Sequence, residues 1–481
     1  MFVKIFQLMK SYLFFALLSI PILMSLSSTA QHISAGGRHT LVICEDSTAQ
    51  SWGYNGYGQL GNGNITEQYS GVKVIGLSEV VFVAGGLFHS IFIKKDGTAW
   101  TCGRNKLGPL GDGTSTDRHI PVQVSKLSDV IQASGGGEHS LFLKRDHTVW
   151  ACGANAAGQL GDGSTLNKME PVAVIGLTDV IQVAAGAEFS LFLKMDGSVW
   201  ACGHNGFGQF GNGTNGSSKI PVQIIGLTDI ISITAGEWHS LFVKKDGTVY
   251  SSGRNQYGQL GNGTQTDNWL ASPIPDLDNI VQAEAGGIHS VFVNADGYVF
   301  ACGLNSGGNN DGQLGDGTSI DRNKPVPVIS SWGQLKIIHA EACREHSLFL
   351  TDNGQIWASG RNNYGQLGSG TSTTTNFSTP IHSNSICSSI SVSFDQLKEY
   401  LNSMLLYPNP MISSGTLKLD FKVDEATIYI YNSYGTLCKQ LNLNNENEIK
   451  LNLADLQPGI YILVLKENHD IIYRYKIVLN R

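Results

Sequence analysis

The chain has 481 residues, a formal net charge of -7 and a pI near 6.0. A surface that binds nucleic acid normally gives a basic excess, so this charge gives no reason to expect a nucleic-acid partner. With 15% charged residues, 41% hydrophobic residues and 57 glycines, the composition indicates a folded, turn-rich protein and excludes disorder for most of the chain.

The first thirty residues predict a secretory signal peptide. Lys4 and Lys10 precede an apolar run, and small residues lead to a cleavage point after Ala30. A retained membrane helix is the alternative, but the run is shorter than the ~20 residues that a span needs, and Pro21 interrupts it. We therefore expect residues 1–30 to be removed, no retained transmembrane segment, and a mature protein outside the cytoplasm.

From residue 31 the sequence repeats with a period of fifty residues. Its most regular position carries a histidine in six copies and Phe189 in the fourth copy. The six, which we call the anchor histidines, are His39, His89, His139, His239, His289 and His346. A period of this length indicates a ring or stack of supersecondary units. The sixth copy is longer than the others, before and after Gly315, and we expect both insertions to lie in loops.

One copy predicts four short strands. In residues 179–224 three alternating or apolar runs read as strands, and a fourth strand begins near Pro221. Asp196-Gly197 predicts the tight hairpin turn between the second and third strands. Such a sheet cannot bury both faces alone, so seven copies predict an all-β, seven-bladed propeller of four-stranded antiparallel blades over residues 31–382. A linear solenoid is the alternative.

The repeat also carries a family resemblance. Ala-Gly-x-x-His-Ser-Leu, then Asp-Gly-x-Val-Trp-x-Cys-Gly, then Asn-x-x-Gly-Gln-Leu-Gly resembles the repeat of the regulator of chromosome condensation family, a seven-bladed propeller. The resemblance covers about residues 31–382, in all seven copies. It implies guanine-nucleotide exchange on a small GTPase as one function, although the signal peptide argues for a location without such a partner.

After the propeller, residues 383–404 read as a linker and residues 405–481 as a small β-sandwich. This segment resembles the C-terminal sorting domain of cargo of the type IX secretion system of Bacteroidetes. The matching residues are Tyr407-Pro408-Asn409-Pro410, Ile428–Asn432 with Gly435, Leu456–Tyr461 and Tyr475–Val478. The resemblance implies contact with the secretion machinery, then release or attachment at the outer surface. A carbohydrate-binding or immunoglobulin-like module is the alternative.

The eight cysteines do not predict a disulfide framework. Four of them occupy one register in different copies, too far apart to pair, and we expect small buried side chains there: Cys102, Cys152, Cys202 and Cys302. The spacing assigns no partner to the other four, which are Cys44, Cys343, Cys387 and Cys438. No Cys-x-x-Cys pair suggests zinc or redox chemistry.

The sequence predicts no catalytic residue, metal site or cofactor. Six equivalent histidines do not make one asymmetric active site, so we expect them to satisfy backbone groups inside each sheet. Turns such as Asp112-Gly113 lack the acid spacing of a calcium loop. A lyase or hydrolase on the propeller face is an alternative; the charged dipeptides Asp117-Arg118 and Asp321-Arg322 are its candidates, and a local ion pair explains them equally well.

Three registers vary from copy to copy, and we call their residues the candidate ring. The residue before each anchor is Arg38, Phe88, Glu138, Glu188, Trp238, Ile288 or Glu345. The second register includes Tyr54, Arg104, His204, Arg254 and Arg361, and the third includes Tyr57, Phe207, Tyr257 and Tyr364. Aromatic residues and arginines are typical anchors of protein interfaces. The sequence therefore predicts a secreted or surface-displayed, non-enzymatic protein that presents this ring to an extracellular protein or glycan.

Overall fold

The computed structural model describes residues 33–44, 46–306, 311–371 and 376–383, followed by residues in and next to the strands between 404 and 479. The chain divides into two compact units near residue 392, and each is described by itself. The expected signal peptide and most of the expected linker lie outside the described residues. No helix in the described part is long and apolar enough to cross a membrane.

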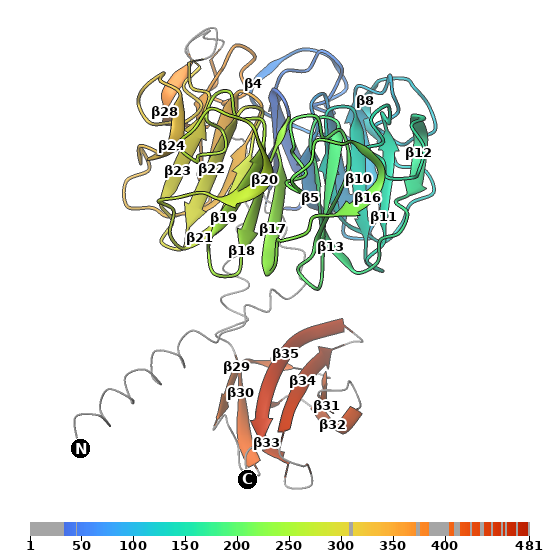
Figure 1. The fold of residues 1–481 in the computed structure, drawn as a ribbon. Helices are drawn as coiled ribbons and strands as arrows, with labels where there is room; N and C mark the ends of the chain where they lie inside the picture. Colours follow the sequence, from blue (N-terminus) through green and yellow to red (C-terminus); the bar gives the residue numbers. More distant parts are fainter. Residues whose placement is uncertain are drawn as a thin grey trace, which may run out of the picture. The chain divides into compact units, whose positions relative to one another are not determined.

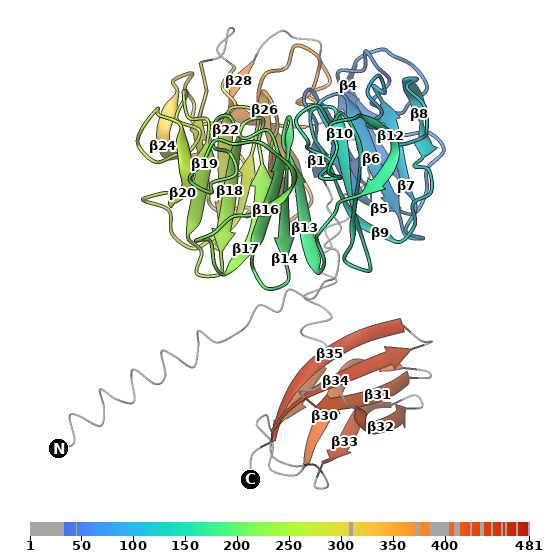
Figure 2. The same ribbon diagram turned by 45° about the vertical axis from the view of Figure 1, so that its right-hand side comes forward.

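The first unit is built from seven four-stranded antiparallel sheets, each made of four consecutive strands (Figures 1 and 2). Blade 1 comprises β1 (Ile33–Ala35), β2 (His39–Ile43), β3 (Ala49–Gly53) and β4 (Gln68–Lys73); blade 2 comprises β5 (Val80–Gly85), β6 (His89–Lys94), β7 (Ala99–Gly103) and β8 (Arg118–Gln123). Blade 3 comprises β9 (Val130–Gly135), β10 (His139–Lys144), β11 (Val149–Gly153) and β12 (Lys168–Ala173); blade 4 comprises β13 (Val180–Ala185), β14 (Phe189–Lys194), β15 (Val199–Gly203) and β16 (Ser218–Gln223). Blade 5 comprises β17 (Ile230–Ala235), β18 (His239–Lys244), β19 (Val249–Gly253) and β20 (Asn268–Pro273); blade 6 comprises β21 (Ile280–Ala285), β22 (His289–Asn294), β23 (Val299–Gly303) and β24 (Arg322–Pro327). Blade 7 comprises β25 (Ile337–Ala342), β26 (His346–Thr351), β27 (Ile356–Gly360) and β28 (Phe377–His382).

The seven-bladed propeller predicted from the period is confirmed, with one correction to a strand. The fourth strand of blade 4 begins at Ser218, so Pro221 lies inside it and not at its start. Proline is tolerated there because β16 is the outer edge strand and its pairing with β15 is irregular around Gly203. Both insertions of the sixth copy fall between strands, as expected.

At six of the seven seams a chain of side-chain hydrogen bonds joins one blade to the next. His89 Nε2 of blade 2 lies 2.9 Å from Ser140 Oγ of blade 3, and Ser140 Oγ donates back to the Pro109 carbonyl of blade 2 at 2.7 Å. A carbonyl only accepts, so the single hydroxyl hydrogen is used there and His89 must donate through Nε2–H. The same His–Ser–carbonyl chain starts from His39, His139, His239 and His289, and at His346 a threonine, Thr40, replaces the serine.

These chains correct the expectation for the anchor histidines. The imidazoles are buried and structural, but each reaches a hydroxyl of the neighbouring blade and not a backbone group of its own sheet. Phe189 is fully buried and makes no such bond, so apolar packing replaces the histidine link between blades 4 and 5, where Ser240 Oγ still donates to the Gln209 carbonyl at 2.6 Å. The hydroxyl partner of each histidine lies about fifty residues away in the sequence, in the next copy of the repeat. The sequence of a single copy therefore does not identify it.

The ring closes where blade 7 meets blade 1, without any exchange of strands. Ile33, Val42 and Trp52 of blade 1 pack with Leu348 and Leu367 of blade 7 in one buried cluster. The Trp52 indole Nε1 also donates to the Gln366 carbonyl at 3.0 Å. Closure therefore depends on side-chain packing across this seam.

The four in-register cysteines are buried, unbridged thiols, each close to a carbonyl of the preceding blade. Burial raises the pKa of the Cys102 thiol far above its usual range, which keeps it protonated. Cys44 is disulfide-bonded, and its partner lies outside the described residues. Cys343 is a buried free thiol.

The second unit contains two sheets. One orders β29 (Met404–Tyr407), β30 (Ser414–Val423) and β33 (Glu446–Asn452); the other orders β32 (Leu437–Leu443), β31 (Ala426–Asn432), β34 (Gly459–Glu467) and β35 (Asp470–Leu479). Ile428 and Ile430 alternate with more exposed residues along β31 and are fully buried, as expected for a strand with one face on a core. The strands follow the alternation from which the β-sandwich was predicted.

Candidate functional site

The three variable registers meet on one face of the propeller. In every blade the anchor position pairs with the last residue of the third strand, for example His239 with Gly253. The backbone amide of the residue that follows this strand then donates to the carbonyl of the residue before the anchor, as Arg254 N does to Trp238 O at 2.9 Å. The equivalent bond exists in all seven blades, so the first two registers lie side by side around the ring. The Asp-Gly hairpins lie at the opposite ends of these strands.

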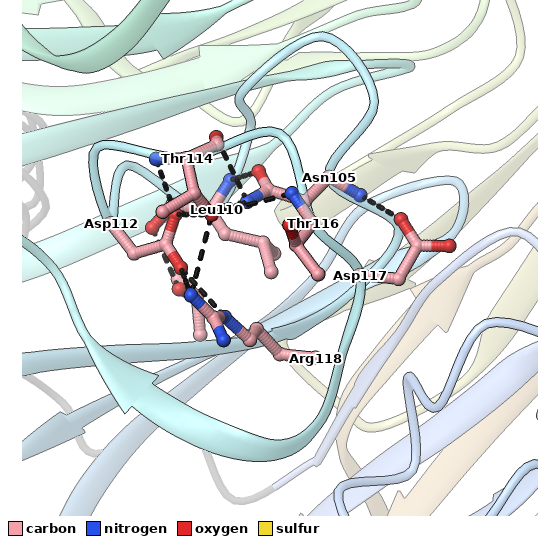
Figure 3. A network of polar contacts seen from close by, with 8 residues as sticks. Asn105, Leu110, Asp112, Thr114, Thr116, Asp117 and Arg118 are labelled. Carbon is pink, nitrogen blue, oxygen red and sulfur yellow. Dashed lines mark hydrogen bonds and ion pairs between the residues drawn. The ribbon is translucent and has the colours of Figure 1, made fainter.

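A buried asparagine fixes the loop that carries the second and third registers (Figure 3). In blade 2 the Asn105 side chain accepts from Leu110 N at 3.1 Å and donates to Asp112 and Thr114. Asp117 Oδ1 accepts from the backbone N–H of Asn105 at 2.7 Å. Arg118 Nε donates to Asp112 Oδ2, also at 2.7 Å. Blade 6 repeats this arrangement with Asp321 and Arg322. The charged dipeptides are thus used in building the loops, and the arginine pairs with the turn aspartate and not with its own neighbour.

The centre of this face is a shallow depression of about 100 Å³, lined by residues of all seven blades. Its wall is mostly glycine and alanine backbone, with Leu87, Glu237 and Arg344 as its larger side chains. Arg344 Nε pairs with Glu237 Oε1 at 2.8 Å. These side chains belong to a fourth variable register, two residues before the anchor, which was not among the predicted registers although it varies in the same way, from Gly37 to Arg344.

Part of the candidate ring forms the closure cluster, which consists of Arg38, Tyr54, Glu345, Arg361 and Tyr364. Arg38 donates to both carboxylate oxygens of Glu345, each at 3.2 Å, and Arg361 donates to the same carboxylate at 2.9 Å. Arg38 also lies over the Tyr364 ring at 5.3 Å, and Tyr54 packs edge-on against that ring at 5.0 Å. These residues tie blade 7 to blade 1, so their charges are already paired.

A second group, the blade 1–2 cluster, contains Tyr57, Phe88 and Arg104 of blades 1 and 2, together with Glu138 of blade 3. The Tyr57 and Phe88 rings lie 5.3 Å apart, and Arg104 covers both while pairing with Glu138. Burial raises the pKa of Glu138, and the nearby Arg104 partly opposes that rise. Here too the guanidinium has a carboxylate partner.

The third group, the blade 4–5 cluster, consists of His204, Phe207, Trp238 and Arg254. Trp238 lies 5.2 Å from the His204 ring and 5.6 Å from the Phe207 ring, and Arg254 lies over Phe207 at 5.5 Å. All four side chains are half-buried. No carboxylate of the described residues pairs with Arg254.

The other ring members stand apart from these clusters. Glu188 is exposed, and Tyr257 and Ile288 are half-buried with no ring contact among the described residues. In blade 3 the second and third registers carry Ala154 and Ala157, so this part of the face has only small side chains in those two registers. Among the described residues no group of three or more histidine, cysteine or acidic side chains is arranged to hold a metal ion.

The profile of the RCC1-like domain matches residues 123–397, which is more than half of the chain. The chain belongs to the RCC1-like domain family. Profiles of the regulator of chromosome condensation (RCC1) repeat match residues 51–93 and 96–143, and again residues 30–59 and 80–108. The family resemblance predicted from the repeat is therefore confirmed.

Curated relatives match this RCC1-like chain only over short stretches. A protein RCC2 homolog of Xenopus laevis is 42% identical over 67 residues, which are 14% of this chain and 13% of that protein. The human E3 ubiquitin-protein ligase HERC2 is 41% identical over 61 residues, 13% of this chain and 1% of that protein. The chain thus spans a small part of the length of these relatives.

Solved structures share the propeller fold. Prp20p of Saccharomyces cerevisiae aligns with a TM-score of 0.61 and 21% identity, covering 70% of this chain and 86% of that one. Human WBSCR16 aligns with a TM-score of 0.61 and 22% identity, covering 72% of this chain and 93% of that one. At these identities the likeness concerns the fold alone.

A secretion system C-terminal sorting domain matches residues 405–480. This confirms the second resemblance and marks the RCC1-like propeller as cargo for export. Such a domain interacts with the type IX secretion machinery, which delivers proteins to the cell surface or outside the cell.

Replacement of Arg38 with alanine tests the closure cluster. The variant loses two charge-assisted hydrogen bonds and a cation–π contact at a half-buried seam, so we expect its free energy of unfolding to fall by about 1–3 kcal/mol. Urea denaturation measures the loss. Lys126→Ala, which removes an ion pair whose lysine side chain is 76% exposed, is the control and should change stability by less than about 0.5 kcal/mol. Equal losses in the two variants would show that the seam does not depend on Arg38.

Proposed function

We propose that this chain is an exported, non-enzymatic binding protein, released or held at the cell surface, whose candidate ring engages an extracellular protein or glycan. One observation carries the proposal: the variable aromatic and arginine side chains of separate blades lie together on one face. Trp, Tyr and Arg dominate the binding energy of protein interfaces because they combine large apolar area with directed hydrogen bonds. A rigid ring of blades holds them without a further ordering cost on binding.

The scaffold chemistry supports binding over catalysis. The anchor histidines donate to hydroxyls between blades, and Asp117 and Asp321 cap loop amides. The groups that an enzyme on this face would most readily use are therefore engaged in holding the fold. The sorting domain supports a location where surface ligands are met.

Guanine-nucleotide exchange is the second candidate, favoured by the fold likeness to Prp20p, a protein with described binding to Gsp1p and histones. Such an activity needs a GTPase partner inside a cell, and the sorting domain argues against that location. Release of bound guanine nucleotide from a small GTPase is the direct assay. We expect this chain not to accelerate the release, and accelerated release would replace our proposal.

A triple variant, Phe88→Ala with Trp238→Ala and Tyr257→Ala, tests the binding face. We expect capture of extracellular proteins and surface glycans by the immobilised mature chain to fall at least tenfold, because the ring loses three of its large aromatic side chains. The matched control is Leu166→Ala with Ile225→Ala and Tyr298→Ala, which removes side chains that are 69%, 82% and 67% exposed and outside the ring. If the ring variant captures as much as the wild type while both variants remain folded, the face assignment is wrong.

A further inference from the structure

The blade 4–5 cluster differs from the rest of the ring in its charge. In the other two clusters each arginine has a carboxylate: Arg38 and Arg361 share Glu345, and Arg104 has Glu138. Arg254 has none among the described residues. Its Nη2 donates to the amide oxygen of Gln256 at 2.7 Å, and its Nε is buried without any partner.

The register explains why Arg254 is left unpaired. Arg104 and Arg361 occupy the same register as Arg254, and the carboxylates that neutralise them stand immediately before an anchor position, in the next blade for Arg104 and in the same blade for Arg361. For Arg254 these two positions are Trp238 and Ile288, and neither side chain carries a charge. The nearby Glu237 is already paired with Arg344. The described residues therefore offer no internal anion at this point of the ring.

An unpaired guanidinium among aromatic rings is suited to receive an anion from outside. The cation lies over Phe207, which is itself packed against Trp238, so part of its hydration is replaced by ring faces. An incoming carboxylate meets a planar donor group that it fits in a bidentate manner, in a partly desolvated setting where charge-assisted hydrogen bonds are strong. The neighbouring ring positions Ile288 and Leu304 are half-buried and aliphatic. Such side chains complement apolar side chains of a protein better than sugar hydroxyls.

We propose that the blade 4–5 cluster is the anchor point for a protein partner and that Arg254 binds an aspartate or glutamate side chain of a partner loop, with Trp238 and Phe207 covering the apolar residues beside it. This inference rests on the proposed function and specifies the partner chemistry of that face.

Panning a display library of constrained twelve-residue peptide loops against the full mature chain tests the inference. Selected loops are expected to carry an Asp or Glu next to an aromatic or aliphatic residue. Their affinity should fall roughly tenfold to a hundredfold in Arg254→Gln and recover only in part in Arg254→Lys, because lysine lacks the bidentate fork. Lys126→Gln, which removes one exposed positive charge outside the ring, is the control and should leave affinity unchanged.

A double-mutant cycle identifies the contact. Changing the acid of a selected loop to its amide should weaken binding to the wild type and have little further effect on Arg254→Gln. Loops that lack an acid, or that bind Arg254→Gln as well as the wild type, would overturn the inference. If Trp238→Ala still abolished their binding, the proposed binding face would stand without it.

Oligogalacturonate and oligoguluronate are the competing probes. Binding of these acidic sugars that is lost in Arg254→Gln, together with failure to select any peptide loop, would assign the site to an anionic glycan and overturn the protein partner. If the triple ring variant still bound both the peptide loops and the acidic sugars as well as the wild type does, that result would count against the proposed function itself.

Discussion

Acidification from pH 7 to pH 5 is expected to destabilise the propeller strongly. Burial lowers the pKa of His39, His139 and His289 to about 3 and that of His89 to about 4, against 6.5 for an exposed histidine. The folded state therefore keeps these rings neutral, while the unfolded chain takes up protons as the pH falls below 6.5. Their contribution to stability is complete above pH 6.5 and is lost progressively toward pH 3 to 4.

The physical reason is the hydrogen-bond chain between blades. Nε2 already donates to a serine or threonine hydroxyl, so a second proton must go on Nδ1, which is buried without a partner in five of the six rings. At pH 5 each ring therefore lowers the free energy of unfolding by about 2 kcal/mol, since this free energy falls by roughly 1.4 kcal/mol for each pH unit below the unfolded pKa of the histidine. Six equivalent rings make this the largest effect that we expect.

Calorimetric melting at pH 7, 6 and 5 measures the effect, and the slope of stability against pH gives the number of protons taken up on unfolding. Four carboxyls whose pKa values are raised chiefly by burial act in the opposite direction: Glu67, Glu138, Glu284 and Asp311. They are fewer than the six histidines. His289→Phe, which copies the natural Phe189, should lower the slope by one proton. An unchanged melting temperature between pH 7 and pH 5 would contradict the account.

The second large effect is expected from Gly136→Ala. A Cβ at this position would lie 2.5 Å from the Gly186 carbonyl oxygen of the next blade and would overlap the His139 ring. The blade seam or the imidazole must therefore shift, and we expect the free energy of unfolding to fall by about 2–4 kcal/mol. Gly216→Ala is the control, because its Cβ meets no atom within 4 Å. Its stability should stay within about 0.5 kcal/mol of the wild type.

Blade 7 carries a side chain in this register, at a seam where threonine also replaces the serine. Cys343 occupies the register of Gly136, and there His346 lies 3.4 Å from Thr40 Oγ1, the longest of the six inter-blade histidine bonds. Urea denaturation of the two glycine variants compares the costs directly. If Gly136→Ala were as stable as Gly216→Ala, the seam would be more adaptable than its packing indicates.

The candidate site was only half predictable. The three variable registers were expected to lie together, and the pairing of each anchor position with the end of the third strand places the first two side by side. The division of their charges was not expected. Arg38 and Arg254 are both arginines at variable positions of the candidate ring. Arg38 forms an ion pair with Glu345, whereas Arg254 has no carboxylate partner among the described residues.

The sequence by itself determined what is local or periodic: the seven blades, the Asp-Gly hairpins and the two family resemblances. Backbone conformation at a turn and alternation along a strand depend on neighbouring residues, so one copy of the repeat reveals them and seven copies confirm them. The tertiary structure decided what lies across a seam. The donor–acceptor pairs of the anchor histidines join residues fifty or more positions apart, and Arg38 meets Glu345 across 307 positions. These contacts exist only because the ring closes, and closure brings together side chains whose sequence neighbours say nothing of their partners.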